Sequence, residues 1–217
     1  MEMAIIEKMK TMNLRKFFIL LLTASAMFLV SCGTGSAEEN QISIRGNGTV
    51  TADSFAAFPE EKYNITLFEE EAKQTVRAYN EEAGSRRIRL LSVSEENGTA
   101  HVTLRYRSCE DYTAFNRETL YYGTVTDGLT NLVFTGNTEL RSIEDNKKVT
   151  LRELGAQEAA GEARYRIVAA NTAAVIRCKG TPLFLSENAQ LDDDGTIRIN
   201  ADAEEDYPQT AYIVYRK

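Results

Sequence analysis

Apolar residues recur at helical spacing in the stretch that follows Thr66. The positions that share one face are Phe68, Ala72, Val76, Tyr79 and Ala83. A period of three to four residues is typical of an amphipathic helix with one face on a core. Thr66 and Glu69 match a capping box, and Gly84 suits the residue that follows a helix C-terminus. We therefore expect a helix over about 67–83.

Alternating apolar and polar residues on both sides of Asn97-Gly98 predict a β-hairpin. Asn-Gly accepts the positive φ angles of a tight primed turn, and the flanking segments are Arg86–Val93 and Thr99–Arg107. One face of the second segment carries Ala100, Val102, Leu104 and Tyr106. The other face carries His101, Thr103, Arg105 and Arg107. We expect the first face to pack in the core and the second to lie in solvent.

Further alternating runs, separated by turn residues, follow to the end of the chain. Ser108 to Asp111 is typical of a helix start and predicts a short helix through Tyr112 and Phe115. A frayed strand is expected over 42–50, and other strands over 120–126, 131–134, 138–143, 148–154, 165–169, 174–178, 183–185, 196–200 and 212–215. This order indicates an α+β fold, mainly antiparallel sheet, with one principal helix, about 67–83, packed on one face. The length of 42–217 suits a single domain.

The N-terminal segment has the composition of an export signal. Arg15 and Lys16 precede an apolar run from Phe17 to Val30, and small residues follow it. The run is shorter than a membrane-spanning helix requires, so we expect a signal peptide over 1–31. Glu2 and Glu7 are unusual in a signal, which makes Met12 an alternative start. Residues 32–41 are expected to form a flexible tether.

Leu29-Val30-Ser31-Cys32 resembles the lipobox of bacterial lipoproteins. That resemblance implies recognition of Leu29, Val30 and Ser31, cleavage before Cys32, and acylation of Cys32 with fatty acids such as palmitate. Several acyl chains anchor far more firmly than one, because each buried methylene contributes roughly 0.8 kcal/mol. The resemblance therefore implies a cell-envelope protein held by lipid on the extracytoplasmic side of a bacterial cell membrane.

The segment from the predicted helix through the hairpin is similar to uncharacterised lipoproteins of Firmicutes. The similarity is carried by Ile88 to Val93, His101 to Leu104, Phe115-Asn116, Leu120 to Val125, Leu183 to Asn188 and Ala211 to Tyr215. The helix followed by LLSVSEENGTAHVTL also resembles the GerM domain of sporulation and germination lipoproteins. These motifs are turns and strand patterns, so the resemblance implies a location and no activity.

The acidic balance of the chain limits its partners. The formal net charge is −7 at pH 7, and the basic excess of the signal leaves the remaining chain more acidic still. Nucleic acid and anionic headgroups attract basic surfaces, so we expect no nucleic-acid partner. The acids are spread in short runs such as Glu69–Glu71 and Asp192–Asp194, which is typical of a solvated surface.

No residue pattern predicts a catalytic residue, a metal site or a cofactor. His101 is the only histidine, so a hydrolytic triad would depend on it, and a catalytic zinc site usually needs more than one. Asp192, Asp194 and Gly195 match part of a calcium loop, but Gln190 and Ala201 stand where its first acidic residue and its final glutamate belong. A polar hairpin turn is the preferred interpretation there.

Cys109 and Cys178 remain once Cys32 is assigned to lipid. An exported protein can join two cysteines as a disulfide, and closing this loop would stabilise the fold by roughly 4 kcal/mol. Two buried free thiols are the other interpretation. The sequence leaves both open.

The leading functional hypothesis is a lipid-anchored binding or interaction module without enzymatic activity, whose partner is an envelope protein or glycan. One alternative is a small carboxylate-dependent glycan hydrolase, which would require carboxyl groups of raised pKa in one cleft. Another is a transporter-associated solute receptor, although two lobes around a ligand usually need a longer chain.

Overall fold

A computed structural model describes residues 39–58, 63–199 and 209–216 of the chain. The predicted signal peptide, Cys32 and most of the predicted tether lie outside these residues. The described part is α+β, with four helices and thirteen strands that pair mostly antiparallel. It divides into two compact units, which we describe separately. The single domain expected over 42–217 stays a prediction.

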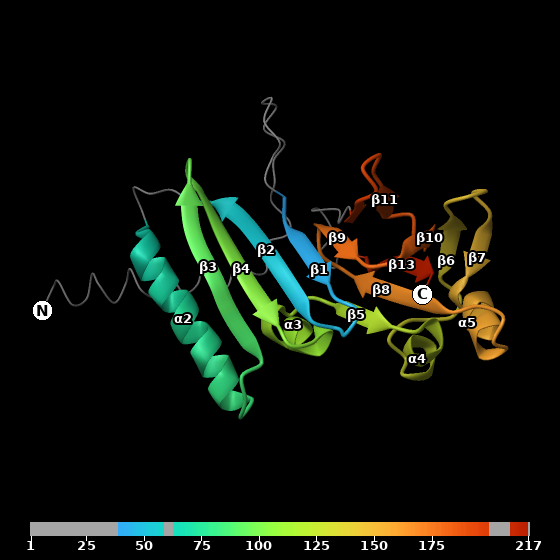
Figure 1. Cartoon of the computed structure of the whole chain (residues 1–217), viewed down its shortest axis with the longest axis horizontal. Helices are drawn as coiled ribbons and strands as arrows, with labels where there is room; N and C mark the ends of the chain where they lie inside the picture. Colours follow the sequence, from blue (N-terminus) through green and yellow to red (C-terminus); the bar gives the residue numbers. More distant parts are fainter. Residues whose placement is uncertain (1–38, 59–62, 200–208, 217) are drawn as a thin grey trace, which may run out of the picture. The chain divides into compact units, whose positions relative to one another are not determined.

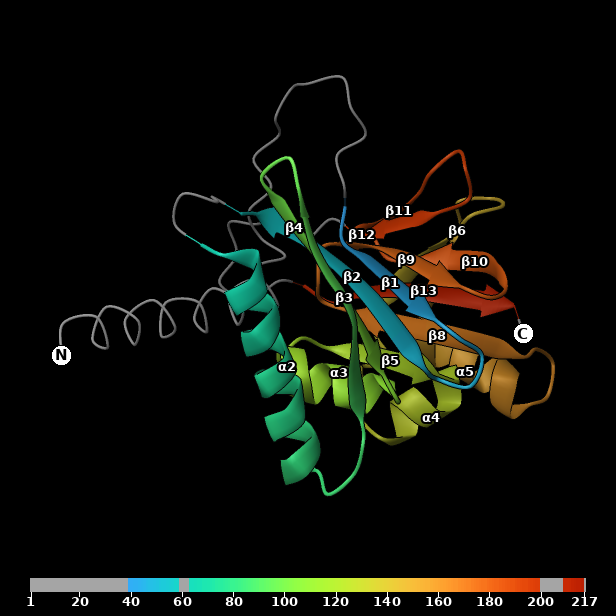
Figure 2. The ribbon, with the colours of Figure 1, turned by 60° about the vertical axis from the view of Figure 1, so that its left-hand side comes forward.

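The first unit takes its described residues from Met1–Ser43 and Thr49–Arg117. Its elements are β1 (Gln41–Ile44, continuing just beyond the unit), β2 (Val50–Ala57), α2 (Ile65–Glu82), β3 (Ile88–Glu96), β4 (Thr99–Tyr106) and α3 (Cys109–Asn116). The strand order in this unit is β1-β2-β4-β3, and α2 runs alongside β3 (Figures 1 and 2). The antiparallel register sets Val50 opposite Tyr106 and Ala57 opposite Thr99.

Helix α2 confirms the predicted principal helix but begins differently. The N-cap is Asn64, whose Oδ1 accepts hydrogen bonds from the backbone of Thr66 and Leu67. The expected capping box at Thr66 is therefore wrong, because the asparagine two residues earlier already satisfies the first free N–H groups. Phe68, Ala72 and Val76 are buried, as the helical period predicted.

The hairpin of β3 and β4 also confirms its prediction. Asn97 and Gly98 have φ values of 52° and 77° and connect the strands in a two-residue turn. Ala100, Val102, Leu104 and Tyr106 are buried, whereas His101, Thr103 and Arg105 are half-buried. The short helix at Ser108 is confirmed as α3, with Ser108 as its N-cap. Tyr106 contacts Tyr112 and Phe115 of α3 edge to face, at centroid distances of 5.1 and 6.0 Å.

The second unit takes its described residues from Ile44–Gly48 and Glu118–Lys217. Its elements are β5 (Leu120–Gly123), α4 (Val125–Thr130), β6 (Glu139–Ser142), β7 (Lys148–Thr150), α5 (Leu151–Ala159), β8 (Tyr165–Ala170), β9 (Ala174–Cys178), β10 (Thr181–Leu185), β11 (Ala189–Leu191), β12 (Ile197–Ile199) and β13 (Ala211–Arg216). A six-stranded sheet has the order β5-β8-β13-β10-β6-β7, and β12 pairs antiparallel with both β11 and β9.

One core of the second unit lies between α4, α5 and the six-stranded sheet. Its buried members are Val125, Phe134, Leu140, Leu151, Leu154, Tyr165, Ile167, Ala169 and Val214. Figure 1 shows both helices beside β8. Burial of these side chains holds the helices on the sheet.

The strand expected over 131–134 is wrong throughout, because these residues form turns and bends and Leu132 has a φ of 56°. Two other strands predicted in this unit are wrong over part of their length. The strand expected over 120–126 stops at Gly123, and the strand expected over 148–154 stops at Thr150. A helix follows each, because the threonine at the junction caps it: the Thr124 hydroxyl accepts from the backbone N–H of Asp127, and Thr150 forms a capping box with Glu153. The described chain therefore has four helices, whereas the sequence predicted the principal helix and the short helix at Ser108. The strand expected over 42–50 is instead the two strands β1 and β2.

Candidate functional site

A groove of about 420 Å³ lies between α2 and the beginning of β3 in the first unit. We call it the α2–β3 groove. Its cationic lining residues are Lys73, Arg77, Arg86 and Arg89. Leu90 is half-buried and supplies apolar surface, Val76 and Ile88 are buried beneath the groove, and Asn80, Glu81 and Ser85 complete the lining. The groove is therefore basic and partly apolar, in a chain whose formal net charge is −7.

Asn80 fixes the position of the helix relative to the strand. Its Oδ1 accepts hydrogen bonds from the backbone N–H groups of Arg87 and Ile88, at 2.7 and 2.9 Å, and its Nδ2 donates to the Ile88 carbonyl at 2.9 Å. One side chain thus satisfies three backbone groups at the start of the strand. The turn between helix and strand passes through Gly84 at φ +63°, a backbone conformation that favours glycine.

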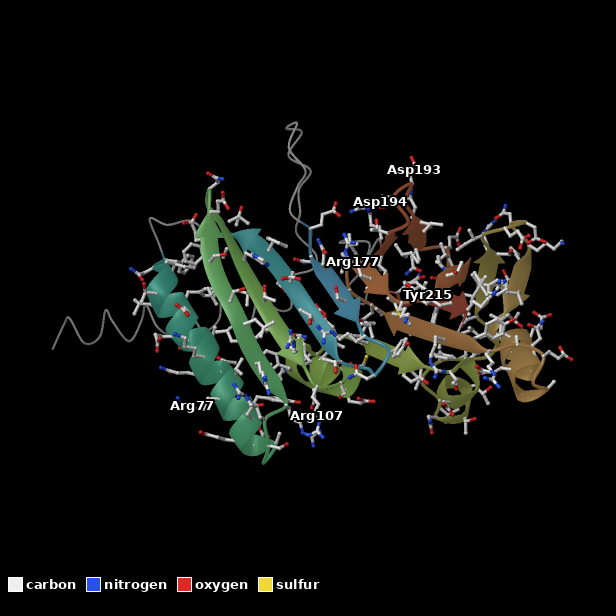
Figure 3. The ribbon with its side chains drawn as sticks, in the orientation of Figure 1. Arg77, Arg107, Arg177, Asp193, Asp194 and Tyr215 are labelled. Atoms are coloured by element: carbon white, nitrogen blue, oxygen red, sulfur yellow. The ribbon has the colours of Figure 1, made fainter. Side chains whose placement is uncertain are left out.

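The cations of the groove differ in their pairing. The Lys73 ammonium lies 3.1 Å from a Glu69 carboxylate oxygen and 2.9 Å from one of Glu70, and its hydrogen bonds to Glu70 and Glu69 raise its pKa. Arg77, Arg86 and Arg89 are exposed, and in the described part of the chain no carboxylate pairs with them. Figure 3 shows Arg77 projecting from α2. Three guanidinium groups are therefore available to an anionic ligand.

His101 has partners that the sequence did not indicate. Its Nε2 lies 3.0 Å from Asp53 Oδ1, and the Thr103 hydroxyl donates to the same oxygen at 2.7 Å. The Phe55 ring stacks on the imidazole at a centroid distance of 4.3 Å. Asp53 and Phe55 belong to β2, most of which the sequence pattern missed, because Asp53 and Ser54 interrupt its apolar residues.

The arrangement around His101 does not match a hydrolytic triad. In a triad the imidazole lies between the carboxylate and the nucleophile and takes the proton of the hydroxyl. Here Asp53 Oδ1 accepts a hydrogen bond from the Thr103 hydroxyl, and the same oxygen lies 3.0 Å from His101 Nε2. The hydroxyl is directed to Asp53, so the group is a cross-strand hydrogen-bond cluster on the polar face of the sheet.

No disulfide joins Cys109 and Cys178 in the structure, and the two residues belong to different units. Burial raises the pKa of Cys178, which disfavours the nucleophilic thiolate. The hydroxyl of the neighbouring Tyr215 is buried without a hydrogen-bond partner in the described residues, and burial raises its pKa. Figure 3 labels Tyr215 on β13. The disulfide between Cys109 and Cys178 stays a prediction for the oxidised protein.

The aspartates of the suspected calcium loop have other contacts. Asp192 forms an ion pair with Arg198 at 3.1 Å, and Asp194 Oδ1 accepts from the backbone and hydroxyl of Thr196 at 2.9 and 2.6 Å. These hydrogen bonds lower the pKa of Asp194. The β11–β12 turn, where Figure 3 labels Asp193 and Asp194, therefore matches the hairpin interpretation. No cluster of metal ligands occurs within the described ranges.

The remaining predicted site residues, Leu29, Val30, Ser31 and Cys32, lie outside the described residues. Of the helices that are described, none has the length and apolar composition to cross a membrane. In comparisons with known proteins, no family model, no curated protein and no solved structure matches this chain. The geometry of its own residues therefore carries the functional argument.

Proposed function

We propose that this protein is a lipid-anchored extracytoplasmic binding module that holds an acidic segment of an envelope protein in the α2–β3 groove. The observation that carries the proposal is the presence of Arg77, Arg86 and Arg89 around the groove without a carboxylate partner in the described chain. Guanidinium groups bind carboxylates with two parallel hydrogen bonds. The anchor rests on the lipobox resemblance at Cys32.

A protein segment suits the groove better than a glycan. Half-buried Leu90 lines it together with the arginines, so a ligand gains by placing an apolar group beside its acidic ones. Acidic and apolar side chains alternate readily along an extended peptide, whereas a polysaccharide offers few apolar groups of that kind. Exposed ion pairs contribute only about 0.2–1 kcal/mol each, so we expect the groove to bind its ligand weakly. Tethering of the protein to the membrane would strengthen this binding, because it raises the effective concentration of the groove near its partner.

The hydrolase alternative has no support among the described residues. A glycan hydrolase needs a carboxyl group whose pKa is raised so that it can donate a proton. Where a carboxyl pKa is shifted clearly, as at Glu110, Asp145, Glu153 and Asp194, hydrogen bonds lower it.

Binding of an acidic peptide to the purified full chain tests the proposal. The probe is a fluorescent peptide of alternating glutamate and leucine, and binding is followed by anisotropy at low salt. The double variant R77Q/R86Q should weaken binding about 2- to 30-fold, because it removes two exposed charge contacts. R107Q is the matched control, since Arg107 is exposed in the same unit but does not line the groove.

Two outcomes would contradict the proposal. Equal binding by R77Q/R86Q and the parent protein would show that the groove is not the site. If a neutral glycan or inorganic polyphosphate binds more tightly than the peptide, the ligand of the groove belongs to that class and is not an acidic protein segment.

A further inference from the structure

The loop after α4 carries a leucine in a backbone conformation that disfavours it. Leu132 has a φ of 56°, and it is the one large apolar residue of the described chain with a positive φ. In this left-handed region the Cβ of an L-residue lies too close to the following carbonyl oxygen, so glycine or asparagine usually occupies it. Strain of this kind persists where the surrounding structure enforces it, and it is common at functional positions.

Leu132 lies at the C-terminal end of α4, where a glycine would relieve the strain. Its N–H donates to the Leu129 carbonyl at 3.3 Å, and the N–H of Val133 donates to the Gly128 carbonyl at 2.9 Å. These two hydrogen bonds form a Schellman motif, whose left-handed position is usually glycine. The leucine side chain is therefore not needed to end the helix.

The Leu132 side chain does not belong to the core either. It is 87% exposed, more than any other large apolar residue in the described chain, and the neighbouring Val133 is 39% exposed. Phe134 is buried and contacts Tyr121 and Tyr212 edge to face, which anchors the loop. A single exposed leucine is ordinary on a protein surface. Here an anchored loop with a strained backbone holds two adjacent apolar side chains outward, and we call this pair the Leu132 tip.

The surroundings of the Leu132 tip suit a lipid surface. Residues 131–138 carry no charge, in a chain of which 26% is charged. Charged groups resist transfer into the layer beneath lipid headgroups, whereas aliphatic side chains gain from it. Arg152 is exposed and lies against Gly136 of the same loop, where a cation can meet lipid phosphates while the leucine enters the apolar layer.

The predicted anchor would bring a lipid surface within reach. Nine residues lead from Cys32 to Gln41, the first residue of β1, and they span at most about 32 Å when extended. Strand β1 leads directly into Ile44–Gly48, which belongs to the second unit. A unit of about 100 residues has a radius of gyration of about 13 Å. The second unit therefore stays close to the membrane that holds the anchor.

We propose that the Leu132 tip inserts into the surface of the membrane that carries the lipid anchor, with Leu132 and Val133 beneath the headgroups. This inference rests on the anchor of the proposed function and does not depend on the α2–β3 groove. Two aliphatic side chains bind a membrane only weakly by themselves. The anchor keeps them at high effective concentration near lipid, so that the contact forms and orients the second unit.

A tryptophan reporter tests the inference, because the chain has no tryptophan of its own. Leu132→Trp, purified from cell membranes, is reconstituted in phosphatidylcholine vesicles whose acyl chains are brominated just below the headgroups. Its emission should shift to shorter wavelength and lose intensity relative to plain vesicles, and high salt should not restore the intensity. Leu67→Trp is the matched control, since Leu67 is 47% exposed on α2 of the first unit, and its emission should change in neither respect.

Two further variants test the tip independently. Val133→Trp, a second reporter, should lose intensity in the same brominated vesicles. Leu132→Gly should have a Tm equal to or above that of the parent protein, because glycine adopts the left-handed conformation without strain. A lower Tm would show that Leu132 supports the fold itself, which would remove the basis of the inference.

Vesicle flotation separates this inference from the proposed function. Protein that does not float with the vesicles lacks the anchor, and the proposed function then fails together with the tip. If the protein floats but neither Leu132→Trp nor Val133→Trp is quenched by brominated lipid, the tip alone is wrong. Equal quenching of Leu67→Trp and Leu132→Trp would also overturn it, because contact with lipid would then not be specific to this loop.

Discussion

At the scale of single residues, short polar side chains decide where elements begin and meet. Asn64 starts α2, Thr124 and Thr150 start α4 and α5, and Asn80 joins α2 to β3. The sequence indicated the helix near Asn64 but not the link made by Asn80. Its partners are seven and eight residues away, just before and at the start of β3, and no local spacing rule includes them.

Asn80→Ala should destabilise the protein by about 1–3 kcal/mol, because it leaves three partly buried backbone groups without partners. Urea unfolding of the full chain measures the loss. Gln74→Ala, an exposed position on the same helix, is the control and should change stability by less than about 0.5 kcal/mol. Equal stability of the two variants would show that Asn80 does not hold the groove together.

At the scale of elements, strong periodicity gave correct predictions, whereas the two short helices α4 and α5 were missed. The pattern over 67–83 and the Asn97-Gly98 turn were confirmed, since both depend on residues close in sequence. Helices α4 and α5 were read as continuations of strands. A few apolar residues fit the period of a strand as well as that of a helix. In the folded protein these segments are helical, because that conformation buries Val125, Leu151 and Leu154 in the core.

The close packing of α4 gives a prediction at this scale. A Cβ at position 128 would overlap the ring of Phe134, which is buried and packed edge to face against Tyr121 and Tyr212 at centroid distances of 5.8 and 5.6 Å. Gly128→Ala should therefore cost about 1–3 kcal/mol, with a lower Tm in calorimetry. Gly46→Ala is the control, since a Cβ there meets no atom within 4 Å. An unchanged Tm for Gly128→Ala would contradict this packing.

At the scale of the whole molecule, we propose a lipid anchor joined to a binding surface. The chain is acidic, yet Arg77, Arg86 and Arg89 line the groove, and none of the described carboxylates pairs with them. A tether from the membrane would hold this surface at high effective concentration near its partners. The anchor itself is a prediction of the sequence, and it has a direct test.

Labelled palmitate supplied to the source cell should be incorporated into the parent protein and lost in Cys32→Ala. The physical reason is that only the thiol at the lipobox becomes the acylated N-terminus. Cys178→Ala is the control for acylation of another thiol and should retain the label. Full labelling of the Cys32→Ala protein would refute the anchor.

The sequence by itself determined the α+β class, the helix α2, the hairpin and its turn, and the expectation of an anchor at Cys32. Each of these depends on short-range periodicity, turn chemistry or a local motif. Only the tertiary structure decided that Asp53 lies beside His101 and that Arg77 and Arg89 line one groove. Those neighbours come from different elements, and packing of apolar faces brings them together in a way that no local pattern records.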